Sequence, residues 1–118
     1  NIKNVNFFKL SQSTNDKEFL DNSFKPNLID FGDKSIFEIS QIMKELDLVV
    51  SSDTSIIHLA GILNVKSILL LNYNSEWRWF EDEKKTIWYP SIDIIKQQKF
   101  NSWDNVFIEL KKRIEKLI

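Results

Sequence analysis

The residues best suited to chemistry in this sequence lie in the stretch SSDTSIIHLAG, residues 51–61. Five small polar side chains follow the apolar run LDLVV and precede a segment with helical spacing. A helix that starts here offers unpaired N–H groups and about half a positive charge, which favour an anion such as a phosphate. The hydroxyl groups of Ser52, Thr54 and Ser55 would add hydrogen bonds. The same pattern is also typical of a turn in which Asp53 or Thr54 simply caps the helix.

His58 is the only histidine of the chain and lies about one turn into this predicted helix. A neutral imidazole can donate a hydrogen bond to a phosphate or sugar oxygen near pH 7. The alternative is a structural histidine whose ring is satisfied by a neighbouring carbonyl group. The sequence leaves both interpretations open.

A second group of candidates lies in the aromatic segment EWRWFEDEKKTIWYPSI, residues 76–92. Arg78 stands between Trp77 and Trp79, where it can pair bidentately with a phosphate or carboxylate while the rings stack on a base or a sugar. Alternatively, the rings cover the edge of a sheet or pack on another domain, and Arg78 pairs with a neighbouring acidic side chain.

Short apolar stretches predict the strands that position these residues. They are VNFFKL (5–10), NLIDFG (27–32), DLVVSS (47–52), SILLLNY (67–73) and SIDIIKQ (91–97). The third and fourth are continuous apolar runs, which are typical of strands covered on both faces. The last has the weakest pattern and is expected at a sheet edge.

Helices are predicted over residues 35–46, 55–63 and 103–117. Ser35 and Glu38 form a capping-box pattern, Asn64 suits the left-handed residue that follows a helix, and Ser102 is the expected N-cap of the last helix. The apolar stripes are Ile36, Ile39, Ile42, Met43 and Leu46 in the first helix and Val106, Phe107, Leu110, Ile114 and Leu117 in the last. Alternating strands and helices predict an α/β fold with a Rossmann-like parallel sheet flanked by helices. Ligands of such sheets bind beyond the carboxyl ends of the strands.

Size and composition limit the function. The 118 residues correspond to one domain, residues 1–118, and 16 basic against 17 acidic side chains argue against nonspecific nucleic-acid binding. The chain has no cysteine, which excludes thiolate chemistry and disulfides and is compatible with a cytoplasmic location. No apolar stretch reaches the roughly 18 residues of a membrane span.

The segment DLVVSSDTSIIHLAGILNV resembles the nucleotide-sugar-binding segment of glycosyltransferase family 9, the heptosyltransferase family. The downstream pattern WRW…WYPSI…KQ…W and the stretch DFGD at 30–33 resemble a branch of it that often ends bacterial tetratricopeptide-repeat proteins. The resemblance covers roughly residues 27–118 and depends on the combination of these motifs.

This resemblance implies the C-terminal half of a two-domain GT-B glycosyltransferase that binds a nucleotide diphosphate sugar. The diphosphate would lie against the helix start at Asp53-Thr54-Ser55. The family's N-terminal half supplies the acceptor contacts and the catalytic base, and transfer is inverting and requires no metal or other cofactor. We therefore predict no catalytic residue in this chain and a missing N-terminal domain as its partner. The candidate substrate-binding residues are Ser11, Asp33, Ser52, Asp53, Thr54, Ser55, His58, Trp77, Arg78 and Trp79.

The sequence departs from the family pattern at several positions. Lys66 replaces a usual proline, and Ser55 replaces the glycine of heptosyltransferases. Glu83 and Asp93 stand where the branch often carries arginine, which would weaken the anion site if those arginines contact the diphosphate.

Two other functions compete with this one. The stretch DLVVSSD superficially resembles the phospho-accepting strand end of a response-regulator receiver, with Asp53 as acceptor, but FFKLSQS offers no acidic pair to hold Mg²⁺. The third hypothesis is a degenerate, non-catalytic domain whose aromatic surface binds another domain or protein.

Overall fold

The computed structural model describes residues 2–10, 28–75, 79 and 86–118. Its elements follow one another as β1 (Phe7–Lys9), β2 (Leu28–Asp30), α2 (Ile36–Lys44), β3 (Val49–Ser51), α3 (Ser55–Ile62), β4 (Ser67–Leu71), β5 (Ile92–Lys96) and α4 (Asp104–Glu115). Each predicted strand and helix is present, although each is shorter than predicted. The alternation of strands and helices confirms the predicted α/β, Rossmann-like class.

The described strands form two small parallel sheets, whereas the sequence predicts one. Strand β1 pairs with β2, and β3, β4 and β5 pair in that order, so β5 lies at the sheet edge as predicted. The two sheets are linked by side chains. Leu10, which follows β1, packs against a buried cluster that includes Met43 of α2 and Val49 of β3. Apolar packing at this junction takes the place of a hydrogen-bonded strand pair.

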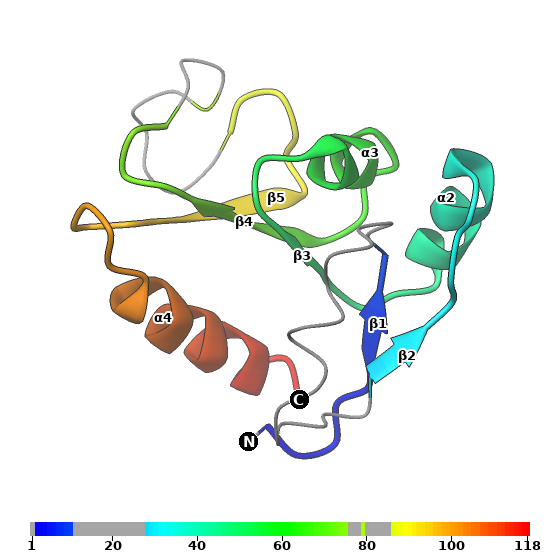
Figure 1. Cartoon of the computed structure of the whole chain (residues 1–118), viewed down its shortest axis with the longest axis horizontal. Helices are drawn as coiled ribbons and strands as arrows, with labels where there is room; N and C mark the ends of the chain where they lie inside the picture. The colour runs from blue at the N-terminus through cyan, green and yellow to red at the C-terminus, as the bar shows by residue number, and fades with distance from the viewer. Residues whose placement is uncertain (1, 11–27, 76–78, 80–85) are drawn as a thin grey trace.

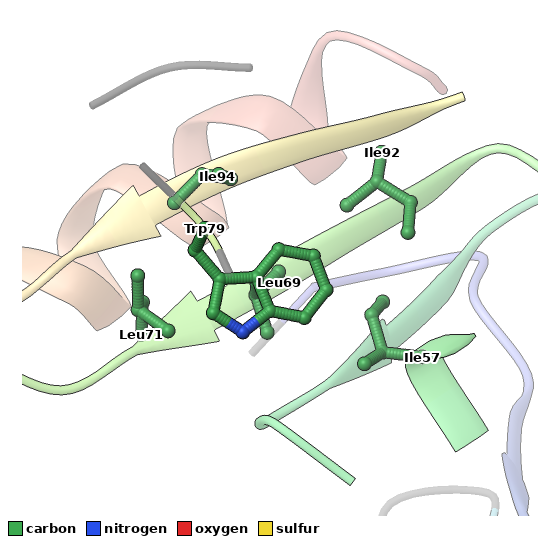
Figure 2. Packing of buried hydrophobic residues seen from close by; sticks show 6 residues of the cluster. All are labelled: Ile57, Leu69, Leu71, Trp79, Ile92 and Ile94. Atoms are coloured by element: carbon green, nitrogen blue, oxygen red, sulfur yellow. The ribbon is translucent and has the colours of Figure 1, made fainter. Parts of the chain in front are cut away.

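Strand β4 is the centre of the larger sheet, with α3 on one face and α4 on the other (Figure 1). Because successive side chains of a strand point to opposite faces, Leu69 and Leu71 pack on the α3 side and Ile68 on the α4 side. The α3-side cluster contains Ile57, Leu69, Leu71, Trp79, Ile92 and Ile94 (Figure 2). The α4-side cluster contains Ile68, Ile95 and Val106. Burial on both faces explains why β4 is a continuous apolar run.

Local signals at the first two helices are confirmed. The Glu38 N–H donates to Ser35 Oγ at 3.2 Å, and the Ser35 N–H donates to Glu38 Oε2 at 2.8 Å, which completes the capping box of α2. Asn64 adopts a left-handed φ of 55° just after α3.

The prediction for the last helix needs two corrections. Ser102 is not the N-cap of α4, because Trp103 takes that position and no side chain caps the helix. The Ser102 backbone is instead held in a turn, where its N–H donates to the Lys99 carbonyl at 3.2 Å. Phe107 was expected on the buried stripe but is 57% exposed and contacts the Trp103 ring.

The stripe predicted for α2 also needs a correction, because Ile36 is 59% exposed. Helices α2 and α4 therefore each bury a narrower apolar stripe than the sequence predicts.

Gly61 allows α3 to approach Tyr89 closely. A Cβ atom at Gly61 would overlap the Tyr89 ring, and Gly61 is itself buried in the last turn of α3. The close approach explains a glycine at a position where helix propensity disfavours it.

We predict that Gly61→Ala destabilises the protein by about 1–2 kcal/mol in urea unfolding, because overpacking costs about 1–3 kcal/mol and the gain in helix propensity returns about 0.5–1. The matched control is Ile62→Ala, since Ile62 is 70% exposed on the same helix. Equal or greater stability of Gly61→Ala would contradict the Tyr89 contact.

We also predict that stability falls as the pH drops below about 4.5. The Ser35 N–H bond lowers the pKa of Glu38 below its ordinary 4.5, and the Gly32 N–H bond lowers the pKa of Asp30 below 3.8. A carboxyl group whose pKa is lower in the folded state stabilises the fold above its unfolded pKa, and this contribution is lost as the pH falls through the folded pKa. Urea unfolding between pH 6 and pH 3 measures the effect. Glu38→Gln should reduce the loss of stability at acid pH. Glu45→Gln, the matched control at the C-cap of the same helix, should leave that loss unchanged.

Candidate functional site

A pocket of about 440 Å³ opens beyond the carboxyl ends of β3 and β4. It is lined by Ser52, Asp53, Leu70, Leu71, Asn72, Asn74 and Trp103. Ser52 and Asp53 follow β3, Asn72 and Asn74 follow β4, and Trp103 precedes α4. This is the place at which open parallel sheets bind ligands.

The start of α3 lies beside this pocket and has no side-chain cap. Thr54 occupies the N-cap position in an extended conformation, but its side chain makes no bond to the helix. Its hydroxyl pairs with Ser51 Oγ at 2.9 Å, and Ser51 Oγ donates to the Ser52 carbonyl at 2.9 Å. Because the Ser51 hydrogen is used on that carbonyl, the Thr54 hydroxyl is the donor of the pair. The predicted turn before α3 is therefore confirmed, but the prediction that a side chain caps the helix is wrong.

His58 joins the pocket to the aromatic segment. Its Nε2 lies 3.5 Å from Asp53 Oδ1, and its Nδ1 lies 3.2 Å from the Tyr89 hydroxyl. The imidazole also packs against the Trp79 ring at a centroid distance of 5.2 Å. His58 is not a lining residue of the pocket; it contacts Asp53, which is. The structure thus brings together His58 and Asp53, both of them predicted site residues, and adds Tyr89, which we did not predict as a site residue.

Trp79 lies inside the protein. It is 1% exposed and packs among Leu69, Leu71 and Ile57, so in this structure it is not available to stack on a base or a sugar (Figure 2). Its indole Nε1 is buried and has no hydrogen-bond partner among the described residues. The packing alternative fits this tryptophan, and through His58 it supports the pocket wall.

Two other predicted site residues, Ser55 and Asp33, do not line the pocket. Ser55 is exposed as the first residue of α3, beside the pocket but not among its lining residues. Asp33 is exposed between β2 and α2 and does not line the pocket. Ser11, Trp77 and Arg78 lie outside the described residues.

Sequence reasoning missed Asn72, Asn74 and Trp103 as pocket residues. Asn72 was assigned to a strand predicted to end at residue 73, but β4 ends at Leu71. Beyond that point the Tyr73 N–H donates to the Gln97 side-chain Oε1 at 2.9 Å. A polar residue directly after an apolar run was the available signal, because the same signal identified Ser52 and Asp53.

Trp103 reaches the pocket because Asn105 fixes the start of α4 to the end of β5. The Asn105 side chain donates to the Lys96 carbonyl at 3.2 Å and accepts from the Gln98 N–H at 3.4 Å. These contacts span seven and nine residues, further than the capping and turn patterns that can be recognised in a sequence.

The described lining combines two leucines, one carboxylate, one hydroxyl, two carboxamides and an indole ring, with no cationic side chain. Such a surface suits a polar group that both donates and accepts hydrogen bonds, whereas an anion would be received by the uncapped N–H groups of α3. Within the described ranges, no cluster of three His, Cys, Asp or Glu side chains could hold a metal ion.

No protein-family model, no curated protein and no solved structure matches the chain. Among the residues that the structure describes, no helix is both long and apolar enough to cross a bilayer.

We predict that Gln97→Leu destabilises the protein by about 1–2 kcal/mol, because the Tyr73 N–H loses its acceptor. The amide signals of Asn72 and Asn74 should shift in the ¹H–¹⁵N spectrum at the same time. The matched control is the neighbouring, exposed Gln98, whose Leu variant should change neither stability nor these two signals. Undisturbed Asn72 and Asn74 signals in Gln97→Leu would show that Gln97 does not position the pocket.

Proposed function

We propose that this chain is the donor-binding domain of an inverting, metal-independent glycosyltransferase of GT-B architecture and that it binds a nucleotide diphosphate sugar. The observation that carries the proposal is the pocket beyond β3 and β4 beside the uncapped N-terminus of α3. The resemblance of residues 47–65 to the nucleotide-sugar-binding segment of glycosyltransferase family 9 supports the same assignment.

In this proposal the two parts of the donor meet different groups. The diphosphate accepts hydrogen bonds from the first N–H groups of α3 and from the hydroxyl of Ser55, because the Thr54 hydrogen is already donated to Ser51. Hydroxyl groups of the ribose or the transferred sugar meet Asn72 and Asn74, whose carboxamides both donate and accept. The pocket thus separates the charged part of the donor from its neutral part.

The contribution of this domain to catalysis is stabilisation of the leaving group. The acceptor hydroxyl oxygen forms a bond to the anomeric carbon while the bond from that carbon to the diphosphate oxygen breaks. Negative charge develops on the departing diphosphate, and fixed N–H groups at a helix start stabilise it. The base that takes the acceptor proton belongs to the missing N-terminal domain, so the isolated chain binds donor without turning it over.

Titration of the ¹⁵N-labelled protein with UDP, GDP and ADP tests the proposal. We expect at least one nucleotide to shift the amide signals of residues 52–57, Asn72 and Asn74. Absence of any shift at millimolar nucleotide would overturn the proposal for this chain.

A sharper test is Ser55→Pro, which removes one N–H group from the helix start. Proline is tolerated at the first helical position, and Thr54 before it is already extended, with φ −136° and ψ 172°. We predict about a tenfold loss of nucleotide diphosphate affinity, since a hydrogen bond to a charged group contributes about 1.5–3 kcal/mol. Ser55→Ala is the matched control: it removes the hydroxyl but keeps the N–H and should lose less affinity. Equal nucleotide diphosphate affinity of Ser55→Pro and Ser55→Ala would show that the phosphates do not bind the Ser55 N–H group.

We propose as the second candidate a non-catalytic interaction domain. The observation that favours it is the exposure of large apolar side chains, among them Phe37 at 71%, Ile62 at 70% and Trp88 at 57%. Exposed apolar groups of this size are common at protein interfaces. The nucleotide titration separates the two functions, because this one predicts no nucleotide response.

A further inference from the structure

The position of the Asp53 carboxylate is unexpected for its sequence context. Aspartate beside a helix start is among the residues that most readily accept hydrogen bonds from the first N–H groups of the helix. Helix α3 nevertheless has no side-chain cap, and Asp53 Oδ1 lies 3.5 Å from His58 Nε2. Something therefore holds this carboxylate against the imidazole and away from the helix start.

The two contacts of the His58 ring show how it can hold Asp53. A carboxylate only accepts hydrogen bonds, so the imidazole attracts Asp53 Oδ1, 3.5 Å away, through a hydrogen on Nε2. In the neutral ring with that hydrogen, Nδ1 has a lone pair to which the Tyr89 hydroxyl at 3.2 Å can donate. Tyr89 thereby pairs the second ring nitrogen and keeps the imidazole oriented toward Asp53.

The surroundings keep this arrangement in place. The Tyr89 ring occupies the space that a side chain at position 61 would fill, because Gly61 has no Cβ atom. The same ring contacts the His58 imidazole edge-on at a centroid distance of 5.8 Å. Trp79 packs against the imidazole from the core, at 5.2 Å. The side chains of His58 and Asp53 are 31% and 30% exposed, so the contact is partly shielded from water.

We propose that Tyr89 and His58 are positioning residues that hold the Asp53 carboxylate on the pocket wall and off the N-terminus of α3. In this role they keep the first N–H groups of α3 open to the anionic part of the ligand. The ligand part of this inference rests on the proposed function. The positioning itself does not, and it can be measured in the protein without any ligand.

The first experiment is Tyr89→Phe, which keeps the ring over Gly61 and removes only the hydroxyl. We expect the ¹⁵N signal of His58 Nδ1 to shift, because this nitrogen loses its hydrogen-bond partner. The amide protons of Ser55 and Ile56 should move downfield, because the released carboxylate now accepts from them. Tyr73→Phe is the matched control, since the Tyr73 side chain makes none of the described contacts with His58. Unchanged His58 signals in Tyr89→Phe would overturn the proposal.

The second experiment measures UDP affinity in a double-mutant cycle. Tyr89→Phe should weaken UDP binding about threefold to tenfold, the usual range for one hydrogen bond. It should have no effect in the Asp53→Ala background, where no carboxylate competes for the helix start. An equal loss in both backgrounds would overturn the positioning role and indicate general damage to the pocket.

The outcomes of the two inferences are separable. A wild-type protein that binds no nucleotide, but whose His58 Nδ1 signal depends on the Tyr89 hydroxyl, would contradict the proposed function and support the positioning. A protein that binds UDP, but whose His58 signals do not respond to Tyr89→Phe, would support the proposed function and contradict the positioning.

Discussion

The burial of β4 between two helices is the constraint on which the rest of the structure depends. Its side chains alternate between the α3-side cluster, with Leu69 and Leu71, and the α4-side cluster, with Ile68. A strand buried on both faces must be paired along both edges, and β3 and β5 do this in parallel. Parallel pairing brings the carboxyl ends of β3 and β4 to the same edge. The polar residues that follow β3 and β4 therefore meet at this edge, and they line the pocket there.

Hydrogen bonds from two side-chain amides then hold the segments that follow β4 and β5 in position. Gln97 ends β4 by offering a side-chain acceptor to Tyr73, and Asn105 ties the start of α4 to β5. Both are amides at the margins of the core, where an unpaired backbone group would be costly. They determine where Asn72 and Trp103 lie, although neither amide lines the pocket. The shape of the site is thus set by residues outside it.

These dependencies explain which features could be predicted from the sequence. The Ser35 cap and the left-handed Asn64 were predictable because their causes lie within a few residues. The polar turn after β3 was predictable for the same reason. The burial of Trp79 and the exposure of Phe107 were not, because an aromatic residue carries no local mark of which neighbour will cover it. The separation of β1 from the larger sheet likewise depends on side-chain packing between distant segments.

The segment after β3 contains an electrostatic conflict that the fold resolves by geometry. A carboxylate beside a helix start stabilises the empty helix terminus but opposes any anion that binds there. In this chain the carboxylate of Asp53 is instead directed toward His58, whose other nitrogen is engaged by Tyr89. Backbone donors and a side-chain acceptor then stand next to each other without satisfying each other. Under the proposed function this is the arrangement that a nucleotide diphosphate sugar requires, since its phosphates need donors and its hydroxyl groups need acceptors within a few ångströms.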